Sequence, residues 1–352
     1  MRALRTQYLD NGLGYNHGQP ATVIEVERDE DYDALYDYIV ESDFYGRAYL
    51  PRQSGMVDDR IISHFWWMAE MVAMLAPRNV VDIGCGRGDF LRLLHDEHGP
   101  AVAGIDFGSA VDSVVWPSLV GTFHNGAILD VLRGWNGPAF DVACGSDIWE
   151  HLHPRTLDET IAELIARSTD DALFWFVVPA FGDDEVFGEQ FPLELEENRE
   201  DFDQRRPFRY LLSDGSDERV PAAGHLTWAH TDWWVEKFEA QGLVRETEIE
   251  RAIHRFADAH IPHSIKSFYL FRRQDAAARE RVARLSMPRV PALASLESIA
   301  RRRRHERKFG ARFTESVGQE LDVWIGANTG ALAAPLRRVA GAATKVAHRV
   351  RQ

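Results

Sequence analysis

Short apolar runs alternate with stretches of helical periodicity along most of the chain. The clearest run, 172–178, is continuously apolar and has the length of a strand covered on both faces. A helix-spaced apolar pattern at 58–75 predicts an amphipathic helix that ends before Pro77. We therefore predict an α/β fold with a doubly wound, mostly parallel sheet of seven strands. The expected strands are 80–83, 104–106, 119–124, 139–144, 172–178, 244–249 and 267–271.

The same patterns divide the chain into three parts. Residues 58–273 carry the α/β pattern, which includes a helix at 231–241 with Thr231 as its N-cap. Periodicity fails over 181–223, where acids dominate, and an insertion of that length after a sheet strand predicts a substrate cap. Residues 1–57 form an N-terminal segment, and residues 274–352 a basic, helical C-terminal extension.

A glycine-rich turn follows the first expected strand. Residues 80–90 read Val-Val-Asp-Ile-Gly-Cys-Gly-Arg-Gly-Asp-Phe, and a helical pattern then begins. A second apolar run ends at Asp106, 18 residues after Gly88. This layout predicts a βαβ unit that grips a nucleoside-containing ligand, because the glycines permit a sharp turn and a close approach of the ligand to the main chain.

The acids around this turn indicate which nucleoside fits. A dinucleotide site would have a third glycine at the place of Asp89, where a pyrophosphate meets the helix N-terminus. Asp89 and Asp82 instead add negative charge, which disfavours a nicotinamide cofactor and favours a phosphate-free ligand with sulfonium and ammonium groups. Asp106 would accept hydrogen bonds from the two ribose hydroxyls.

These residues resemble the first motif of the class I, Rossmann-like S-adenosylmethionine (SAM) dependent methyltransferases, over roughly residues 76–273. The resemblance implies a transferase that uses SAM, and an N-terminal lid over the cofactor with Tyr45, Tyr49 and Arg52 as candidates. The acid that reads adenine in this family is expected where the chain has Ala127 or Ile128. The implied cofactor-binding residues are Asp82, Gly84, Cys85, Gly86, Gly88, Asp106, Phe107, Gly145 and Asp147.

A second motif, residues 147–151, follows the strand expected at 139–144. Loops at the carboxyl ends of parallel strands face one crevice, so this loop should face the glycine turn. His151 and His225 are candidate catalytic bases for an acceptor hydroxyl, with Glu150 or Asp147 to orient them.

The same segment also suggests a metal site. Some family members use an E-x-x-E-H motif and a later histidine to bind a divalent ion, and Asp147, Glu150, His151 and His225 resemble that set. A cation would lower the pKa of the hydroxyl, and this mixed set suits Mn²⁺ or Fe²⁺ better than Mg²⁺. The alternative is a metal-free site, because the Glu-His pair is also widespread in members that bind no metal.

The charge of the chain is uneven. The net charge is −15, but residues 272–352 carry +11 and the remainder −26. So acidic a body argues against nucleic acid as a partner. The basic run 301–308 and the amphipathic stretch 335–351 could contact an anionic membrane surface, dock on the acidic body or form a partly disordered tail. With two cysteines and no apolar span, we expect a cytoplasmic protein, which membrane contact through the basic tail would place at the inner membrane face.

The function predicted from the sequence is SAM-dependent O-methylation of a small molecule. We expect a sugar or glycan acceptor, because three tryptophans near the site could stack on sugar faces, namely Trp228, Trp233 and Trp234. One alternative is an RNA ribose methyltransferase, which would use the basic tail. The other is a non-catalytic module that binds SAM without turnover.

Overall fold

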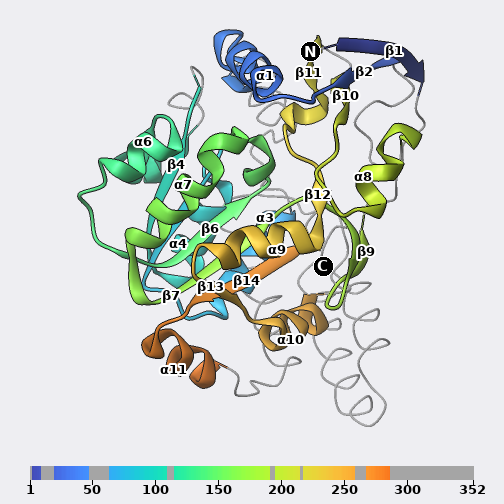
Figure 1. Cartoon of the computed structure of the whole chain (residues 1–352). Coiled ribbons are helices and arrows are strands. Elements are labelled where there is room, and N and C mark those ends of the chain that lie inside the picture. Colours follow the sequence, from blue (N-terminus) through green and yellow to red (C-terminus); the bar gives the residue numbers. More distant parts are fainter. Residues whose placement is uncertain are drawn as a thin grey trace, which may run out of the picture.

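The computed structural model describes residues 2–8, 20–46, 63–108, 115–190, 195–214, 217–257 and 267–285. All statements below concern these residues (Figure 1). Tyr49, Arg52 and the basic extension beyond residue 285 lie outside them, as does the first part of the helix expected at 58–75. No helix in the described part is both long and apolar enough to cross a membrane.

A seven-stranded sheet forms the centre of the molecule, as predicted. Its order is β13-β14-β7-β6-β3-β4-β5, and β14 alone runs antiparallel to its neighbours. The order reverses between β3 and β6, which places a crevice at their carboxyl ends. The strands are β3 (Asn79–Ile83), β4 (Ala101–Asp106), β5 (Phe123–Asn125), β6 (Phe140–Ser146), β7 (Ser168–Val177), β13 (Leu243–Arg245) and β14 (Phe268–Arg273).

Helices cover both faces of this sheet, and successive residues of each strand point their side chains toward opposite faces. Val80, Val142 and Trp175 belong to one core cluster, while Val81 and Ala143 belong to the other. The first face packs against α3 (Ser63–Ala73), α4 (Asp89–His98), α10 (Thr247–Ala257) and α11 (Ala276–Leu285). The second packs against α6 (Ile128–Arg133), α7 (Pro154–Ala166) and α9 (Thr231–Ala240).

Three local predictions were wrong in detail. The strand expected at 119–124 is mostly a 3₁₀ helix, Pro117–Thr122, because a proline starts a helical turn readily. The strand expected at 244–249 ends at Arg245, and α10 follows because Ile249 and Ile253, one turn apart, both pack on the core. The N-cap of α9 is His230, whose ring nitrogen accepts a hydrogen bond from Asp232 N at 3.0 Å.

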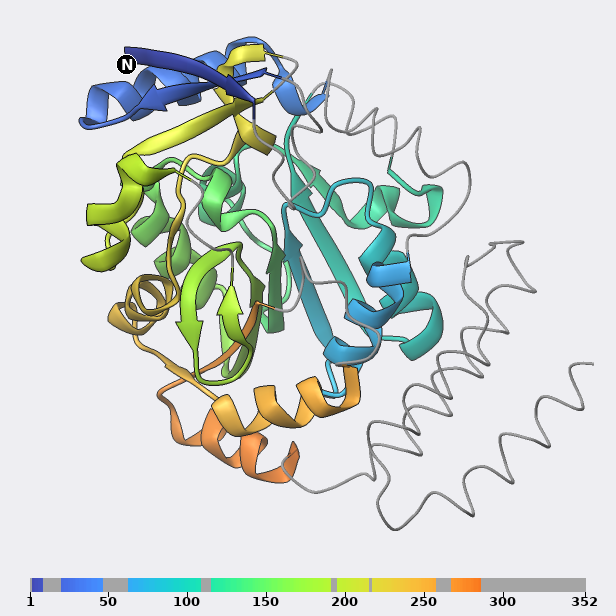
Figure 2. The same ribbon diagram turned by 90° about the vertical axis from the view of Figure 1, so that its right-hand side faces the viewer.

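A second sheet joins the N-terminal segment to the insertion. Its order is β1-β2-β10-β11, so β2 of the N-terminal segment pairs directly with β10 of the insertion (Figure 2). Helix α1 (Asp29–Glu41) packs against this sheet through Leu35 and Ile39. We call the sheet and α1 together the cap. The strands are β1 (Arg2–Tyr8), β2 (Pro20–Glu25), β10 (Tyr210–Asp214) and β11 (Asp217–Pro221).

The rest of the insertion lies between β7 and the cap. A small sheet combines β8 (Ala180–Asp184), β9 (Gly188–Gln190) and β12 (Ala229–His230). A 3₁₀ turn (Glu196–Asn198) and α8 (Arg199–Asp203) follow. The lid expected at 1–57 and the insertion expected at 181–223 thus share one sheet, while the domain boundaries themselves stay predictions.

Arg281 of α11 fastens this helix to the sheet. Its guanidinium donates to the carbonyls of Asp141 at 2.7 Å and Leu75 at 2.9 Å, and its side chain is buried. It also pairs with the carboxylate of Asp141 at 3.2 Å. The helix therefore belongs to the packed body, although it follows residue 273.

We expect Arg281→Met to destabilise the protein by roughly 3 kcal/mol, because it removes one partner of a buried pair and leaves buried carbonyls unbonded. The midpoint of thermal unfolding should fall by about 6–12 °C for a domain of this size. Arg284→Met, on the exposed side of the same helix, is the control and should change little. Equal midpoints for the two variants would contradict the assignment.

Candidate active site

The glycine turn after β3 has the geometry that the sequence predicted. Gly84, Gly86 and Gly88 have φ values of 71°, 53° and 83°, in the left-handed region that favours glycine. A Cβ atom on Gly84 would lie 2.7 Å from Cγ1 of Ile148. The turn therefore packs directly against the loop after β6.

Two carboxyl groups flank this turn, that of buried Asp82 and that of half-buried Asp106. Asp106 accepts hydrogen bonds from Gly86 N at 2.5 Å and Phe107 N at 2.7 Å, which ties the end of β4 to the glycine turn. Burial raises the pKa of Asp106 to about 6, and burial together with the charge of Asp106 raises the pKa of Asp82 to about 8. Neither acid forms an ion pair with a described Arg or Lys, so a ligand carrying a positive charge fits this site.

Asp89 has a different role from the one expected. Its carboxylate lies 2.8 Å from Arg87 Nε and accepts a hydrogen bond from Trp116 Nε1 at 2.6 Å. The charge is therefore neutralised within the protein, so Asp89 does not repel a phosphate as we had inferred. The electrostatic argument for a cationic ligand depends instead on Asp82 and Asp106.

The remaining expected cofactor residues line the same region. Cys85 Sγ lies against Gly104, where a Cβ atom would come within 2.6 Å of it. Gly145 pairs with Ile83 in the sheet, and Asp147 has a φ of 51° with its N–H bonded to Val177 O at 3.0 Å. Burial raises the pKa of Asp147 to about 7. Asp130, by contrast, is a surface residue of α6 with a side chain 78% exposed.

The second motif forms a short 3₁₀ helix, Trp149–His151, directly after β6. The carbonyl of Glu150 accepts hydrogen bonds from Leu226 N at 2.7 Å and Thr227 N at 3.1 Å. These bonds fasten the segment after the 3₁₀ turn Ala222–Gly224 to the motif. They are the reason why His225 lies beside His151.

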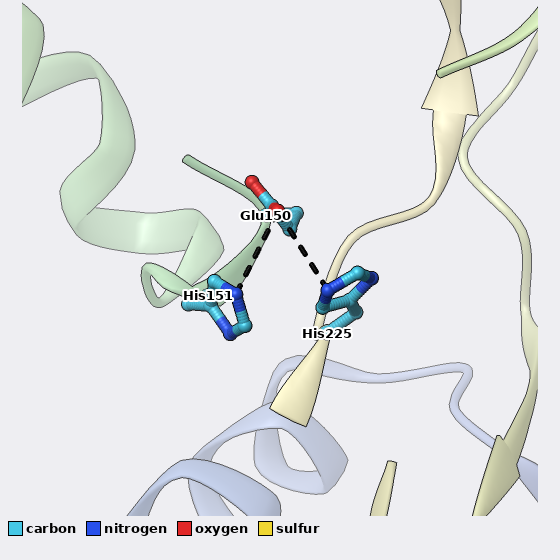
Figure 3. Close-up of side chains that lie close together, drawn as sticks. All are labelled: Glu150, His151 and His225. Atoms are coloured by element: carbon cyan, nitrogen blue, oxygen red, sulfur yellow. Dashed lines mark ion pairs between the residues drawn. The ribbon is translucent and has the colours of Figure 1, made fainter. Parts of the chain in front are cut away.

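Glu150, His151 and His225 converge, as predicted (Figure 3). Oε1 of Glu150 lies 3.6 Å from Nε2 of His151 and 3.7 Å from Nε2 of His225. The two imidazole rings are 4.7 Å apart and nearly perpendicular. All three residues are buried, and neither carboxyl oxygen of Glu150 forms a hydrogen bond with any residue that the structure describes. We call these three residues the acid–histidine cluster.

Burial shifts the protonation of the whole cluster toward neutral forms. It raises the pKa of Glu150 well above its usual value, with a further contribution from the charge of Asp147. It lowers the pKa of His151 to about 4, and it lowers the pKa of His225 well below its usual value, with a contribution from His151. Neutral imidazoles offer lone pairs to a ligand or a cation, but they are weak proton acceptors at such pKa values.

The donor set fits a divalent cation in kind. One ligand atom from each member of the cluster lies within 4.8 Å of the others. Ligands about 2.1 Å from a common ion would be separated by about 3.0–3.4 Å, so these atoms, which lie 3.6–3.7 Å and at most 4.8 Å apart, would have to draw closer around an ion. Asp147, which the sequence placed in this set, does not belong to the group that the described residues form.

Two further aromatic side chains lie next to the cluster. Tyr45, one of the expected lid residues, places its hydroxyl 2.8 Å from Nδ1 of His151. The ring of Trp228 lies 5.0 Å from that of His225. The other two tryptophans do not serve the site as expected, because Trp234 is fully buried in the core and Trp233 packs on it.

A family model described as a methyltransferase domain matches residues 65–256, more than half of the chain. No curated protein matches the sequence.

Among similar solved structures is an O-methyltransferase family protein from Burkholderia thailandensis, at 15% identity and a TM-score of 0.39. The match covers 68% of this chain and 62% of that protein, so the chain spans less than two thirds of its length. A 1,6-didemethyltoxoflavin-N1-methyltransferase from the same organism has 16% identity, a TM-score of 0.42 and coverage of 77% and 100%. The sugar N-methyltransferase KedS8 from Streptoalloteichus sp ATCC 53650 has 15% identity, a TM-score of 0.35 and coverage of 70% and 90%. Scores this low carry no argument about the activity of the chain.

Proposed function

Because the chain belongs to the methyltransferase-domain family and is a class I SAM-dependent methyltransferase, we propose that it methylates a hydroxyl of a small molecule, a sugar or glycan. The acid–histidine cluster is the observation that carries the proposal. It lies at the carboxyl end of β6, beside the glycine turn that would hold SAM. Its oxygen and nitrogen atoms lie close together and all three side chains are buried, so they could bind an acceptor oxygen away from bulk water.

The reaction is an in-line displacement. The acceptor oxygen forms a bond to the methyl carbon while the carbon–sulfur bond breaks, and the sulfur takes the electron pair. The hydroxyl proton leaves to solvent, because the neutral imidazoles of the cluster are weak proton acceptors. The protein contributes by aligning the two reactants, by excluding water and by stabilising the oxygen as it loses its proton.

We propose that the cluster holds a divalent cation for this purpose, with Glu150, His151 and His225 as its ligands. Support comes from the carboxyl group of Glu150, which is buried without a hydrogen bond between two imidazoles. A bound cation would supply Lewis-acid chemistry that lowers the pKa of the acceptor hydroxyl. The nitrogen-rich donor set favours Mn²⁺ or Fe²⁺ over Mg²⁺.

Exhaustive chelation should remove the cation and most of the activity. We expect turnover to fall about 10²-fold or more, because the hydroxyl would no longer be acidified. Readdition of Mn²⁺ should restore it. Elemental analysis of the protein before and after chelation gives a readout that does not depend on activity. Full turnover by a metal-free protein would eliminate the cation and leave the histidines to act directly.

The proposal that the acceptor is a sugar depends on Trp228. Trp228 is half-buried next to His225, where its ring could stack on a sugar face. The experiment that tests the proposed function is incubation with SAM labelled in its methyl group and a pool of sugars, nucleotide sugars and glycosides. A methyl carbon bonded to oxygen in the product supports the proposal. Label found only on nitrogen or carbon, or only in RNA, would contradict it.

A further inference from the structure

Three segments that are distant in the sequence meet at Nδ1 of His151. Tyr45, from the segment after α1, places its hydroxyl 2.8 Å from this nitrogen, and the carbonyl of Gly224 lies 3.2 Å away. The Tyr45 hydroxyl also reaches the Gly224 carbonyl at 3.3 Å. Gly224 has a φ of 83°, and a Cβ atom there would lie 2.5 Å from the Tyr45 hydroxyl oxygen. The close approach therefore requires a glycine at this position.

The hydrogen-bonding capacities of these groups select one tautomer of His151. A carbonyl only accepts, so the contact between Gly224 O and Nδ1 requires a proton on Nδ1. Nδ1–H then donates to Tyr45 Oη and Gly224 O, and the Tyr45 hydroxyl donates to Gly224 O. Every donor has an acceptor in this arrangement. Nε2 is left with its lone pair, and it faces Glu150 Oε1 within the cluster.

Tyr45 also contacts the loop that follows the cofactor strand. Its ring packs edge-on against that of Phe107, with centroids 5.6 Å apart. The next residue, Gly46, lies against Gly108, where a Cβ atom would come within 3.4 Å of Gly46 N. One aromatic side chain therefore touches both the cofactor loop and the acceptor-side histidine.

We propose that Tyr45 is a positioning residue that holds the ring of His151, whose Nδ1–H tautomer the Gly224 carbonyl selects, and links its orientation to the cofactor loop at 106–108. The proposal rests on the proposed function, in which Nε2 of His151 serves the acceptor oxygen. Partners that orient such a histidine change activity by about 10–100-fold when they are removed.

Tyr45→Phe tests this directly, since it keeps the ring contacts with Phe107 and removes only the hydroxyl. We expect kcat to fall about 10–100-fold, with the Kd for SAM changed less than twofold in calorimetry. Tyr45→Ala should also weaken SAM binding, because the contact with Phe107 is lost. Tyr38→Phe is the matched control, since this α1 residue donates to Asp217 at 2.6 Å, away from the cluster. It should leave kcat unchanged.

Nitrogen NMR of histidine-labelled protein gives a readout that needs neither acceptor nor turnover. His151, assigned with a His151→Asn variant, should show a protonated Nδ1 in the wild type. In Tyr45→Phe the Nδ1 and Nε2 shifts should move, because Nδ1–H loses the Tyr45 hydroxyl and keeps only the Gly224 carbonyl. Unchanged ring signals, or an unchanged kcat where an acceptor is known, would overturn the proposal. Failure to find any O-methylated product would count against the proposed function but would leave the tautomer result interpretable.

Discussion

Glu150→Gln should lower methyl transfer by about 10³-fold while leaving SAM binding within a few-fold of the wild type. The amide has the shape of the neutral carboxylic acid that burial favours at this position, so the fold should persist. It cannot become an anion, however, and so cannot support a cation or a protonated imidazole between His151 and His225. Single-turnover rates with labelled SAM measure the effect, and calorimetry with S-adenosylhomocysteine confirms that the cofactor site is intact.

Glu159→Gln is a suitable control for this variant, because Glu159 is an exposed residue of α7 that pairs with Arg133. It should have wild-type rates. If Glu150→Gln retained more than a tenth of the wild-type rate, the acid–histidine cluster would not be the catalytic centre. If it also lost SAM binding, its effect would lie in the fold or in the cofactor site.

Asp106→Ala should weaken SAM binding by about 100-fold or more, equivalent to about 3 kcal/mol. The carboxylate would lose its hydrogen bonds to the ribose hydroxyls, and charge-assisted bonds of this kind contribute about 1.5–3 kcal/mol each. The substitution would also leave the N–H groups of Gly86 and Phe107 without the carboxylate that accepts their hydrogen bonds. Both the lost ribose contacts and the released turn affect the cofactor site. The free energy of SAM binding should therefore change more than the free energy of unfolding.

Asp130→Ala provides the comparison for the cofactor site. Asp130 follows the place where related enzymes carry an adenine-reading acid, but its side chain points into solvent. Its removal should leave the Kd for SAM unchanged. A tenfold loss would show that α6 moves toward the cofactor when SAM binds. Wild-type affinity for Asp106→Ala would contradict the assignment of the cofactor site itself.

The sequence predicted the parts of the site that are local in the chain. The glycine turn and the motif 147–151 each follow a strand end, and strand ends of a parallel sheet meet at one edge. The turn at Gly84 and the 3₁₀ helix at 149–151 therefore came together without any long-range information. The meeting of His225 with His151 was also expected, but only as a resemblance to a known pattern.

Other features depend on contacts between residues far apart, which periodicity does not encode. The Glu150 carbonyl binds Leu226 N, and that bond places His225. The pairing of β2 with β10 unites the N-terminal segment with the insertion, although each strand alone has a weak pattern. The neutralisation of Asp89 depends on Trp116, a loop residue whose role has no local signal. Each of these features depends on a partner that lies far away in the chain, which local sequence patterns do not specify.

A crystal structure with S-adenosylhomocysteine bound tests the central claim most directly. The account predicts that Asp106 binds the ribose and that the sulfur faces Nε2 of His151 and His225 across a space for one methyl group and one oxygen. In that space the reacting atoms can approach to about 3–3.5 Å. A sulfur that faces away from the acid–histidine cluster, or is separated from it by Ile148, would contradict the account.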